Sequence, residues 1–420
     1  MSTKREIRGF WWPATRPEPH WFGVLTLESE HSPTLEVVVE ATNMFDDMKP
    51  AGGVIHGKDE GGKPITLLFV TESGHRSSVA VHSRTFHAGY ALLGIAVDKV
   101  SDFVVNDLCL RCQQLYGWLG ISGFKRATAA SSEGVTFQYR QPEELVFAVS
   151  DEMEIRVRTS WSSHDSFQRQ RVEEEAVIAF RSPSGFSLER CLDLVGAMRY
   201  LLNFASLKPV YPIRMVALKN GYGQHWEGRC LRHDIEVWNA ALRGAETEPP
   251  LPDRWLFRFE DVRGKFVTFM REWLGYVERF EEALGCYAAT VYHQLPASLE
   301  HLCIAQALEA YRGVKSQSHE KVTFRAKIGD LVTLHGPALK GLVDNSSAFA
   351  DEVLASRNYY THHDPRLLKR GKVAKGEDLI RLNAKLGILF QMCVLSDLGV
   401  SPDRFLQLRR QIPTEIVMFP

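Results

Sequence analysis

Two different hydrophobic patterns divide the chain. From Phe22 to about Phe180 the apolar residues come in short, β-branched runs separated by turn-forming residues, which favours an antiparallel, all-β unit. The runs are Val24–Leu27, Leu35–Val39, Ile65–Val70, Val79–Val81, Val135–Tyr139, Leu145–Val149, Glu154–Arg158 and Ala176–Phe180. Glycines crowd the interval between the second and third runs, as a loose connection between strands requires.

At Ser187 the hydrophobic period changes from that of a strand to that of a helix. The apolar residues that recur at helical spacing are Leu188, Leu192, Val195, Met198 and Leu202. They predict an amphipathic helix that packs on the sheet. The polar, proline-rich stretch Glu246–Asp253 can neither continue a helix nor add to a core, so we expect the main domain boundary near residue 250.

Beyond Trp255 almost the whole chain has a helical pattern. The expected helices are Val262–Tyr292, Ala297–Arg312, Lys321–Leu334, Ser346–His362, Glu377–Leu398 and Pro402–Gln411. One leucine-rich stripe along the fifth of them is the face that a bundle would bury. The predicted fold class is α+β. An N-terminal antiparallel β-rich domain, residues 1–250, is β-rich to about residue 180 and mixed α/β after it, and an all-α helical bundle follows over residues 251–420.

Composition narrows the classes of protein. The 420 residues, 45% hydrophobic and 24% charged, are typical of a globular protein with two or three domains. The 50 Lys and Arg residues are balanced by 51 Asp and Glu residues, so any phosphate-binding surface must be local. Seven scattered cysteines are typical of free thiols, and neither a signal peptide nor a membrane span is indicated. We therefore expect a cytoplasmic protein.

The segment 348–365 carries the candidate chemistry. An Asp-Pro pair ends the predicted helix directly after His362 and His363, which places Arg357, Asn358 and His362 in its last turns. Asn358 and His362 are four residues apart and project side by side. Arg357 is rotated by about 140° from His362 but is long enough to reach the same spot.

These residue types suit phosphodiester chemistry without a metal. A guanidinium matches a phosphate, and an imidazole exchanges protons near neutral pH. His362 would take the proton of an RNA 2′-hydroxyl, Arg357 would stabilise the transition state, and Asn358 would orient the phosphate or the imidazole. Helices also end in basic residues simply to complement the macrodipole and bind the last carbonyls. The residues alone leave both interpretations open.

The string R-N-Y-Y-T-H, Arg357–His362, resembles the R-x4-6-H motif of the HEPN superfamily of ribonucleases. A preceding helix with Gln306–Arg312 and a following leucine-rich helix that ends at Gly399 give an order similar to the Apea-like HEPN branch, over about residues 285–415. Four short strings near the N-terminus resemble the N-terminal domain of ApeA-type proteins. They are Gly9–Pro13, Gly23–Leu25, Ile55–Gly57 and Ile65–Leu68.

The resemblance implies an anti-phage protein of bacterial abortive infection. The expected activity is a metal-independent HEPN endoribonuclease without cofactors that leaves a 2′,3′-cyclic phosphate on its RNA substrate, with tRNA as one candidate. The expected partner is a second copy, so that two Arg/His sets face one cleft, and the N-terminal domain would sense a phage-derived trigger. No membrane partner is expected.

The resemblance leaves the identity of the base open. His363 gives the spacing R-x5-H, so either imidazole is a candidate, and His362 is preferred because it shares a helix face with Asn358. The toxin branch of the superfamily has a tyrosine two residues after the histidine, where this chain has Asp364. The tyrosine nucleotidylation known in that branch is therefore not expected in this protein.

Two groups of charged residues are candidates for binding substrate. Glu309 and Arg312 lie on the neighbouring helix, and Glu309 would hold Arg357 or a histidine in place unless it forms only a surface ion pair. The cations downstream of the motif would steer phosphate unless they only solvate a loop. They are Arg366, Lys369 and Arg370, followed by Lys372 and Lys375.

Two further clusters have mainly structural interpretations. Cys109 and Cys112 form one C-x-x-C among leucines with no second pair, so we expect a helical core position rather than a zinc site. The aromatic group Trp11, Trp12, Trp21 and Phe22 packs over the end of a small sheet, with base stacking as the alternative.

Two other classes of function compete with the enzyme. In one, the helical domain is a non-catalytic RNA- or nucleotide-binding regulatory module. In the other, it is only a dimerisation scaffold for a sensing β domain.

Overall fold

A computed structural model describes most of the chain. The described residues are 4–16, 20–29, 31–40, 53–77, 81–127, 136–166, 169–226, 229–239, 244, 248, 250, 254–316, 322–339, 341–368 and 372–400. They cluster into two compact units. Unit 1 comprises the chain up to Tyr116, Ile121–Arg199 and Tyr211–Glu248. Unit 2 comprises Gly117–Gly120, Tyr200–Val210 and the chain beyond residue 248. The domain boundary near residue 250 stays a prediction.

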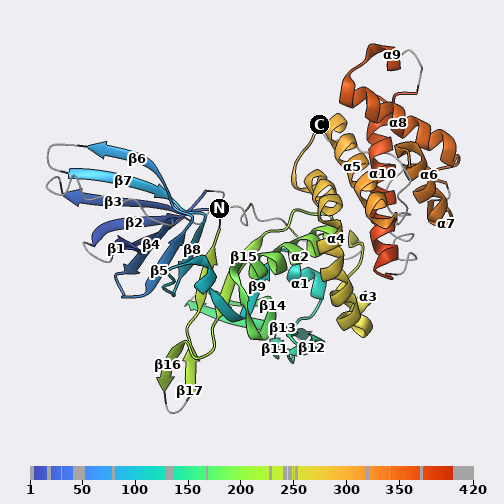
Figure 1. The fold of residues 1–420 in the computed structure, drawn as a ribbon. Helices are drawn as coiled ribbons and strands as arrows, with labels where there is room; N and C mark the ends of the chain where they lie inside the picture. The colour runs from blue at the N-terminus through green and yellow to red at the C-terminus, as the bar shows by residue number, and fades with distance from the viewer. Residues whose placement is uncertain are drawn as a thin grey trace. The chain divides into compact units, whose positions relative to one another are not determined.

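Unit 1 is built on one antiparallel sheet of fourteen strands within the described residues (Figure 1). Its strand order is β12-β13-β14-β9-β15-β18-β8-β5-β4-β1-β2-β3-β7-β6. The strands of the sheet are β1 (Arg5–Pro13), β2 (Trp21–Leu27), β3 (Thr34–Glu40), β4 (Val54–Asp59), β5 (Pro64–Leu68), β6 (Thr71–Ser77), β7 (Val81–His87), β8 (Tyr90–Leu93), β9 (Val104–Cys112), β12 (Leu145–Ser150), β13 (Met153–Ser166), β14 (Arg169–Ser187), β15 (Pro212–Leu218) and β18 (Ile235–Trp238).

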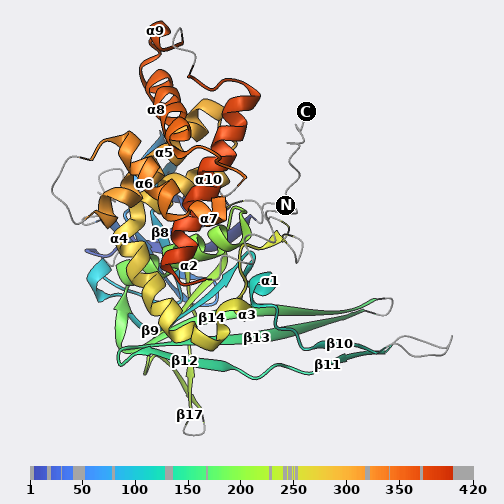
Figure 2. The ribbon, with the colours of Figure 1, turned by 90° about the vertical axis from the view of Figure 1, so that its right-hand side faces the viewer.

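Two hairpins stand apart from the large sheet. β10 (Phe124–Ala127) pairs with β11 (Thr136–Tyr139), and β16 (Gly223–Trp226) pairs with β17 (Arg229–Arg232). Figure 2 shows the first hairpin beside the long β13–β14 ribbon, and the rings of Tyr139 and Trp161 lie 5.7 Å apart there. The predicted antiparallel β-rich N-terminal region is therefore confirmed. Val79 and Val135 lie outside the described residues.

One expectation in this region is wrong. Cys109 and Cys112 lie in strand β9, not in a helix. Leu108, Leu110 and Cys112 are buried while Cys109 and Arg111 on the other face are more accessible, which is the two-residue period of a strand. Among the described residues no group of three or more His, Cys, Asp or Glu side chains gathers as metal ligands would.

Trp11 belongs to the core formed by β1–β5, β7 and β8. Its side chain is fully buried with Leu25, Leu35 and Phe86, and its Nε1 donates to the carbonyl of Gly23 at 3.3 Å. Trp21 is also buried, Trp12 is half-buried, and Phe22 is 47% exposed. Trp12 packs against the same core, so three of the four aromatic residues singled out in the sequence serve packing.

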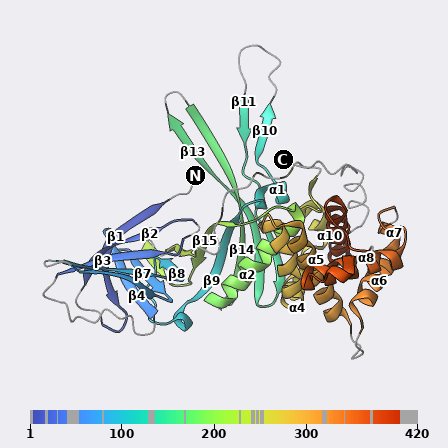
Figure 3. The ribbon, with the colours of Figure 1, turned by 90° about the horizontal axis from the view of Figure 1, so that it is seen from above.

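Helix α2 (Leu188–Ser206) follows directly on β14, as the change of period at Ser187 predicts. The Ser187 hydroxyl accepts from the backbone N–H of Arg190 at 3.2 Å and caps the first turn. Figures 1 and 3 show α2 running along the strands around β9 and β14. The inner faces of β9 and β14 are buried, and so is the apolar stripe of α2 apart from the half-buried Leu192.

Unit 2 is helical, which confirms the predicted fold class for the C-terminal region (Figure 3). Its helices are α3 (Phe259–Val262), α4 (Phe266–Tyr292), α5 (Ala297–Lys315), α6 (Phe324–Leu334), α7 (Gly336–Leu339), α8 (Ser346–His362), α9 (Pro365–Leu368) and α10 (Glu377–Asp397). The short helix α1 (Leu115–Leu119) leads into the Gly117–Gly120 segment of this unit. The expected helix Pro402–Gln411 lies outside the described residues.

Helix α5 is central to the bundle, because it contacts α4, α6, α8 and α10. Its Tyr311 stacks on Phe280 of α4 at 5.3 Å between ring centroids. Its His301 is fully buried, and the Nδ1 atom lies 2.9 Å from Oδ1 of Asn383 on α10. Asn383 in turn donates to the carbonyl of Ala297 at 2.8 Å. A polar link thus joins two helices within an apolar core.

By length and composition α10 alone among the described helices could cross a membrane. Its most apolar 18-residue stretch has a mean hydropathy of 1.4, and 61% of that stretch is buried within the protein. Leu382, Leu386, Leu389 and Phe390 are all buried. The apolar character of α10 is thus used in core packing, as its leucine stripe predicts.

The packing of Trp11 on Gly57 gives a stability prediction. A Cβ atom at Gly57 would lie 2.3 Å from the Trp11 ring, so we expect Gly57→Ala to lower the free energy of unfolding of unit 1 by about 1–3 kcal/mol. Urea denaturation followed by tryptophan fluorescence measures this. Gly196→Ala is the matched control, because that glycine lies inside α2 with open space around it and alanine there should stabilise. Equal effects of the two substitutions would contradict the packing argument.

His301 makes unit 2 sensitive to acid. Burial lowers the pKa of His301, and its hydrogen bond to Asn383 opposes this only in part. The stability that neutral His301 contributes is full above the pKa of about 6.5 expected in the unfolded chain and is lost as the pH falls further. We expect the melting temperature of the wild type to drop more steeply between pH 7 and pH 5 than that of His301→Gln. Identical pH slopes by calorimetry would refute a titrating His301.

Candidate functional site

Helix α8 begins and ends where the sequence predicts. Asn345 caps its N-terminus by accepting from the backbone N–H of Ala348 at 3.0 Å. At the other end His363 takes the left-handed conformation with φ of 51°, and its N–H donates to the carbonyl of Tyr359 at 2.6 Å. The Asp-Pro pair that follows disfavours further helix. Arg357, Asn358 and His362 therefore lie in the last two turns of α8.

Arg357 continues the buried face of α8 that contains Val353, because the two are four residues apart. Its Nη2 atom donates to Oε2 of Glu309 on α5 at 2.7 Å, and its guanidinium lies 4.5 Å from the ring centroid of Phe324 on α6. The side chains of Arg357 and Glu309 are only 30% and 25% exposed. A salt bridge and a cation–π contact from two helices thus hold this cation in one position.

Lys327 adds a second cation to this cluster. Its Nζ atom lies 3.6 Å from Oε1 of Glu309, so the carboxylate is shared between Lys327 and Arg357. Two positive charges around one negative charge leave the cluster positive overall. It can therefore attract an anion such as a phosphate, with Arg357 already oriented.

His362 and Asn358 project to the other side of the helix end. His362 is exposed and Asn358 is half-buried, and within the described residues neither side chain has a hydrogen-bond or ion-pair partner. The His363 ring lies 5.8 Å from the Tyr359 ring, so the two candidate imidazoles differ in their surroundings. Both imidazoles are exposed, and His363 also terminates the helix, so the preference for His362 as the base stays a prediction.

The loop before α10 is tied to the same part of α8. The hydroxyl of the fully buried Ser356 accepts from the backbone N–H of Ala374 at 3.0 Å, and the Tyr360 hydroxyl donates to the carbonyl of Ala374 at 2.8 Å. Lys375, one residue further, lies 5.8 Å from the centroid of the Tyr359 ring. These bonds place a lysine near the end of α8.

The described residues among the remaining binding candidates have partners of their own. Arg312 pairs with Asp330 of α6 at 3.0 Å, and Arg366 pairs with Asp364 at 3.0 Å while its side chain stays 87% exposed. Lys372 pairs with Asp351 at 3.0 Å. Lys369 and Arg370 lie outside the described residues. The structure thus brings Glu309 to Arg357 but turns Arg312 to a different carboxylate, and the substrate contacts of all these residues stay predictions.

Sequence reasoning missed Phe324 and Lys327. Both lie on α6, which Thr323 caps by accepting from the backbone N–H of Ala326 at 3.3 Å. The chain between α5 and α6 and between α6 and α8 has no motif that connects these residues to Arg357. Only the periodic pattern that buries Phe324 could have placed it on the inner face of its helix.

Comparison with protein families agrees with the architecture. The sequence model of ApeA N-terminal domain 1 matches residues 6–273, and that of the Apea-like HEPN domain matches residues 302–404. The first match alone covers more than half of the chain. The chain therefore belongs to the family of ApeA-type proteins, as its motifs predict. No curated protein and no solved structure matches it. HEPN domains generally have a ribonuclease fold, which supports a nuclease-type module of anti-phage defence.

The contact between Glu309 and Arg357 can be tested energetically. A double-mutant cycle with Glu309→Gln and Arg357→Gln should give a coupling of about 0.2–1 kcal/mol in urea denaturation, since the pair is partly exposed. The pair of Arg312 with Asp330 serves as the control, and its coupling should be smaller because Asp330 is 52% exposed. No measurable coupling between Glu309 and Arg357 would show that they do not interact in solution.

Proposed function

We propose that this protein is a metal-independent HEPN endoribonuclease of an abortive-infection defence system. The observation that carries the proposal is the end of α8, where a positioned Arg357 and an exposed His362 lie five residues apart. Membership of the ApeA-type family and the HEPN match support it. The substrate is RNA, with tRNA as one candidate, and the enzyme acts in the cytoplasm.

The proposed reaction is a transesterification within the RNA. His362 takes the proton from a ribose 2′-hydroxyl, and the 2′-oxygen forms a bond to the neighbouring phosphorus. Arg357 stabilises the negative charge on the non-bridging oxygens, while Asn358 orients the phosphate or the imidazole. The bond from phosphorus to the 5′-oxygen breaks, and that oxygen takes a proton. The products are a 2′,3′-cyclic phosphate and a 5′-hydroxyl.

The leaving oxygen needs an acid as well as the base. At the end of α8 the described residues include two exposed imidazoles, His362 and His363, and of these His362 shares a helix face with Asn358. We propose that the protein forms a homodimer in which the second copy contributes its own arginine and histidine to the same cleft. The histidine of that copy, in its protonated form, is the acid. Under this proposal the N-terminal unit senses a phage-derived trigger and regulates the cleft.

Cleavage of labelled tRNA by the full-length protein in EDTA tests the mechanism. His362→Ala and Arg357→Ala should each lower the cleavage rate by about 10²- to 10⁴-fold, because each removes one group from the transition state. His363→Asn should stay within about 10-fold of the wild type, since asparagine also accepts the left-handed conformation at that position. Analysis of the product ends should find the cyclic phosphate.

Matched controls separate catalysis from folding. His293→Ala and Arg381→Ala remove a histidine and an arginine from exposed positions elsewhere in the helical unit, so cleavage should be unchanged. Full activity of both site variants refutes the enzyme assignment. Tight retention of intact RNA supports the alternative, a non-catalytic binding module. If Arg357→Ala changes neither cleavage nor RNA binding, the helical domain is better explained as a dimerisation scaffold.

A further inference from the structure

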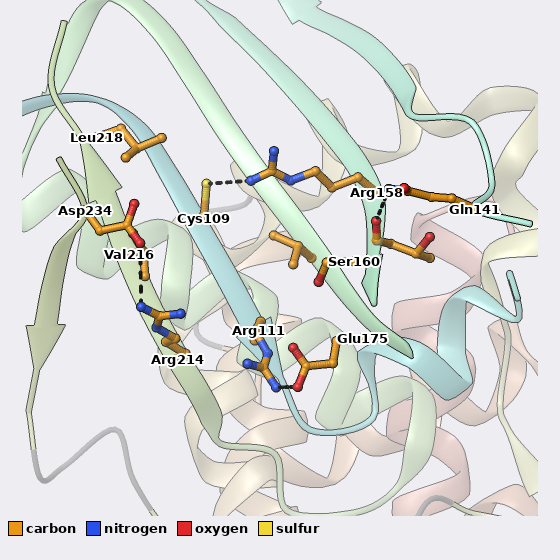
Figure 4. A pocket seen from close by; sticks show the side chains of 12 residues that line it. Cys109, Arg111, Gln141, Arg158, Ser160, Glu175, Arg214, Val216, Leu218 and Asp234 are labelled. Atoms are coloured by element: carbon orange, nitrogen blue, oxygen red, sulfur yellow. Dashed lines mark hydrogen bonds and ion pairs between the residues drawn. The ribbon is translucent and has the colours of Figure 1, made fainter. Parts of the chain in front are cut away.

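Unit 1 contains a hollow on the sheet face opposite the one that packs with α2. Its volume is about 390 Å³, within the range of small-molecule sites. The outward side chains of β9, β13, β14 and β15 line it, and Figure 4 shows the arginines among them. These are Arg111, Arg158 and Arg214. The hollow thus brings three guanidiniums together in a chain with a formal net charge of −1.

Two of the three arginines are neutralised by carboxylates. Arg111 of β9 pairs with Glu175 of β14, and Arg214 of β15 lies 3.6 Å from Asp234. Arg156, on the same strand and face as Arg158 but outside the lining of the hollow, pairs with Glu154 at 2.6 Å. Charge pairing is thus the rule on this face of the sheet.

Arg158 is the exception. Within the described residues its guanidinium has no carboxylate partner, and its Nη2 atom instead lies 3.8 Å from the Sγ atom of Cys109. A thiol is a weak acceptor, and burial raises the pKa of Cys109, which keeps the thiol neutral. Figure 4 shows Arg158 extended across the strands towards Cys109. The hollow therefore contains one positive charge that the surrounding side chains do not balance.

The rest of the lining is suited to the body of an organic ligand. Val177 and Val216 are buried and Leu218 is half-buried, and together they form an apolar surface beside the guanidiniums. The hydroxyl of Ser160 lines the same hollow and can donate or accept a hydrogen bond. An apolar wall next to an unbalanced cation matches a ligand with a flat apolar part and an anionic part.

We propose that this hollow binds a small organic phosphate of the size of a nucleoside monophosphate, with Arg158 as the primary phosphate ligand. A phosphate group has three acceptor oxygens, so it can accept from Arg158 and from a neighbouring arginine at the same time. The base lies against the valines and leucine. This site belongs to unit 1 and does not depend on the ribonuclease proposal, so either can fail without the other.

Calorimetric titration of the full-length protein tests the site. The probes are AMP, GMP, CMP and UMP, with the matching nucleosides and inorganic phosphate as comparators. At least one nucleotide should bind about 10-fold or more tightly than its nucleoside, because the phosphate provides the charge contact. Arg158→Gln should weaken this binding by about 10-fold or more. The affinity of Arg158→Lys should lie between those of the wild type and Arg158→Gln, because lysine keeps the charge but lacks the planar guanidinium.

Arg156→Gln is the matched control, since it removes a guanidinium that is already paired on the same strand. Nucleotide binding by this variant should stay within about twofold of the wild type. Arg158 is exposed, so its substitution should leave the melting curve unchanged. The proposal is overturned if no nucleotide binds at up to about 1 mM. It is also overturned if Arg156→Gln weakens nucleotide binding as much as Arg158→Gln does. A protein that binds only an RNA oligonucleotide and no mononucleotide would overturn it as well.

Discussion

The salt bridge between Arg357 and Glu309 is the contact on which the candidate site depends. Consecutive residues of an α-helix are rotated by about 100°, so a residue five positions later points about 140° away. Helix α8 uses this rotation to direct Arg357 inward onto α5 and α6 while His362 stays in solvent. The cation is therefore rigid and the imidazole is accessible. The structure thus holds the charge in place and leaves the imidazole accessible on a different side of the same helix end, so a substrate would have to reach both.

The charge of Glu309 also limits how strongly the Arg357 cluster attracts an anion. Its carboxylate balances only one of two nearby cations, so the cluster attracts an anion without leaving a bare arginine in a half-buried place. A phosphate that approaches Arg357 competes with Glu309 for the same guanidinium, which has further N–H groups to offer. Lys327 then keeps Glu309 partly neutralised. Under the proposed function, the cluster would bind an anion without breaking the contacts that hold Arg357 in position.

Local patterns predict helix boundaries well and tertiary partners poorly, and this chain shows both. The Ser346–His362 helix was predictable because an Asp-Pro pair ends it at a fixed place, and the resemblance to HEPN motifs pointed to Arg357. Lys327 was not predictable, since it reaches Glu309 only through the packing of α6 on its neighbours. Cys109 was misassigned because the leucines near it suggested a helix, whereas a two-residue alternation buries one face of β9.

The two proposals together place anion sites at two separate points of an almost neutral chain. Carboxylates pair with many of its cations and leave a local excess of positive charge at each point. On the outer face of the β9–β13–β14–β15 sheet, carboxylates neutralise the arginines around Arg158 and leave it alone. In the helical unit, one carboxylate serves two cations at Arg357. The net charge of the chain does not reveal either site, because each site has an excess of only one positive charge, which local geometry creates. Under both proposals, phosphate recognition depends on places where cations outnumber carboxylates. These are Arg158 on the sheet, and Arg357 with Lys327 around Glu309 in the helical unit.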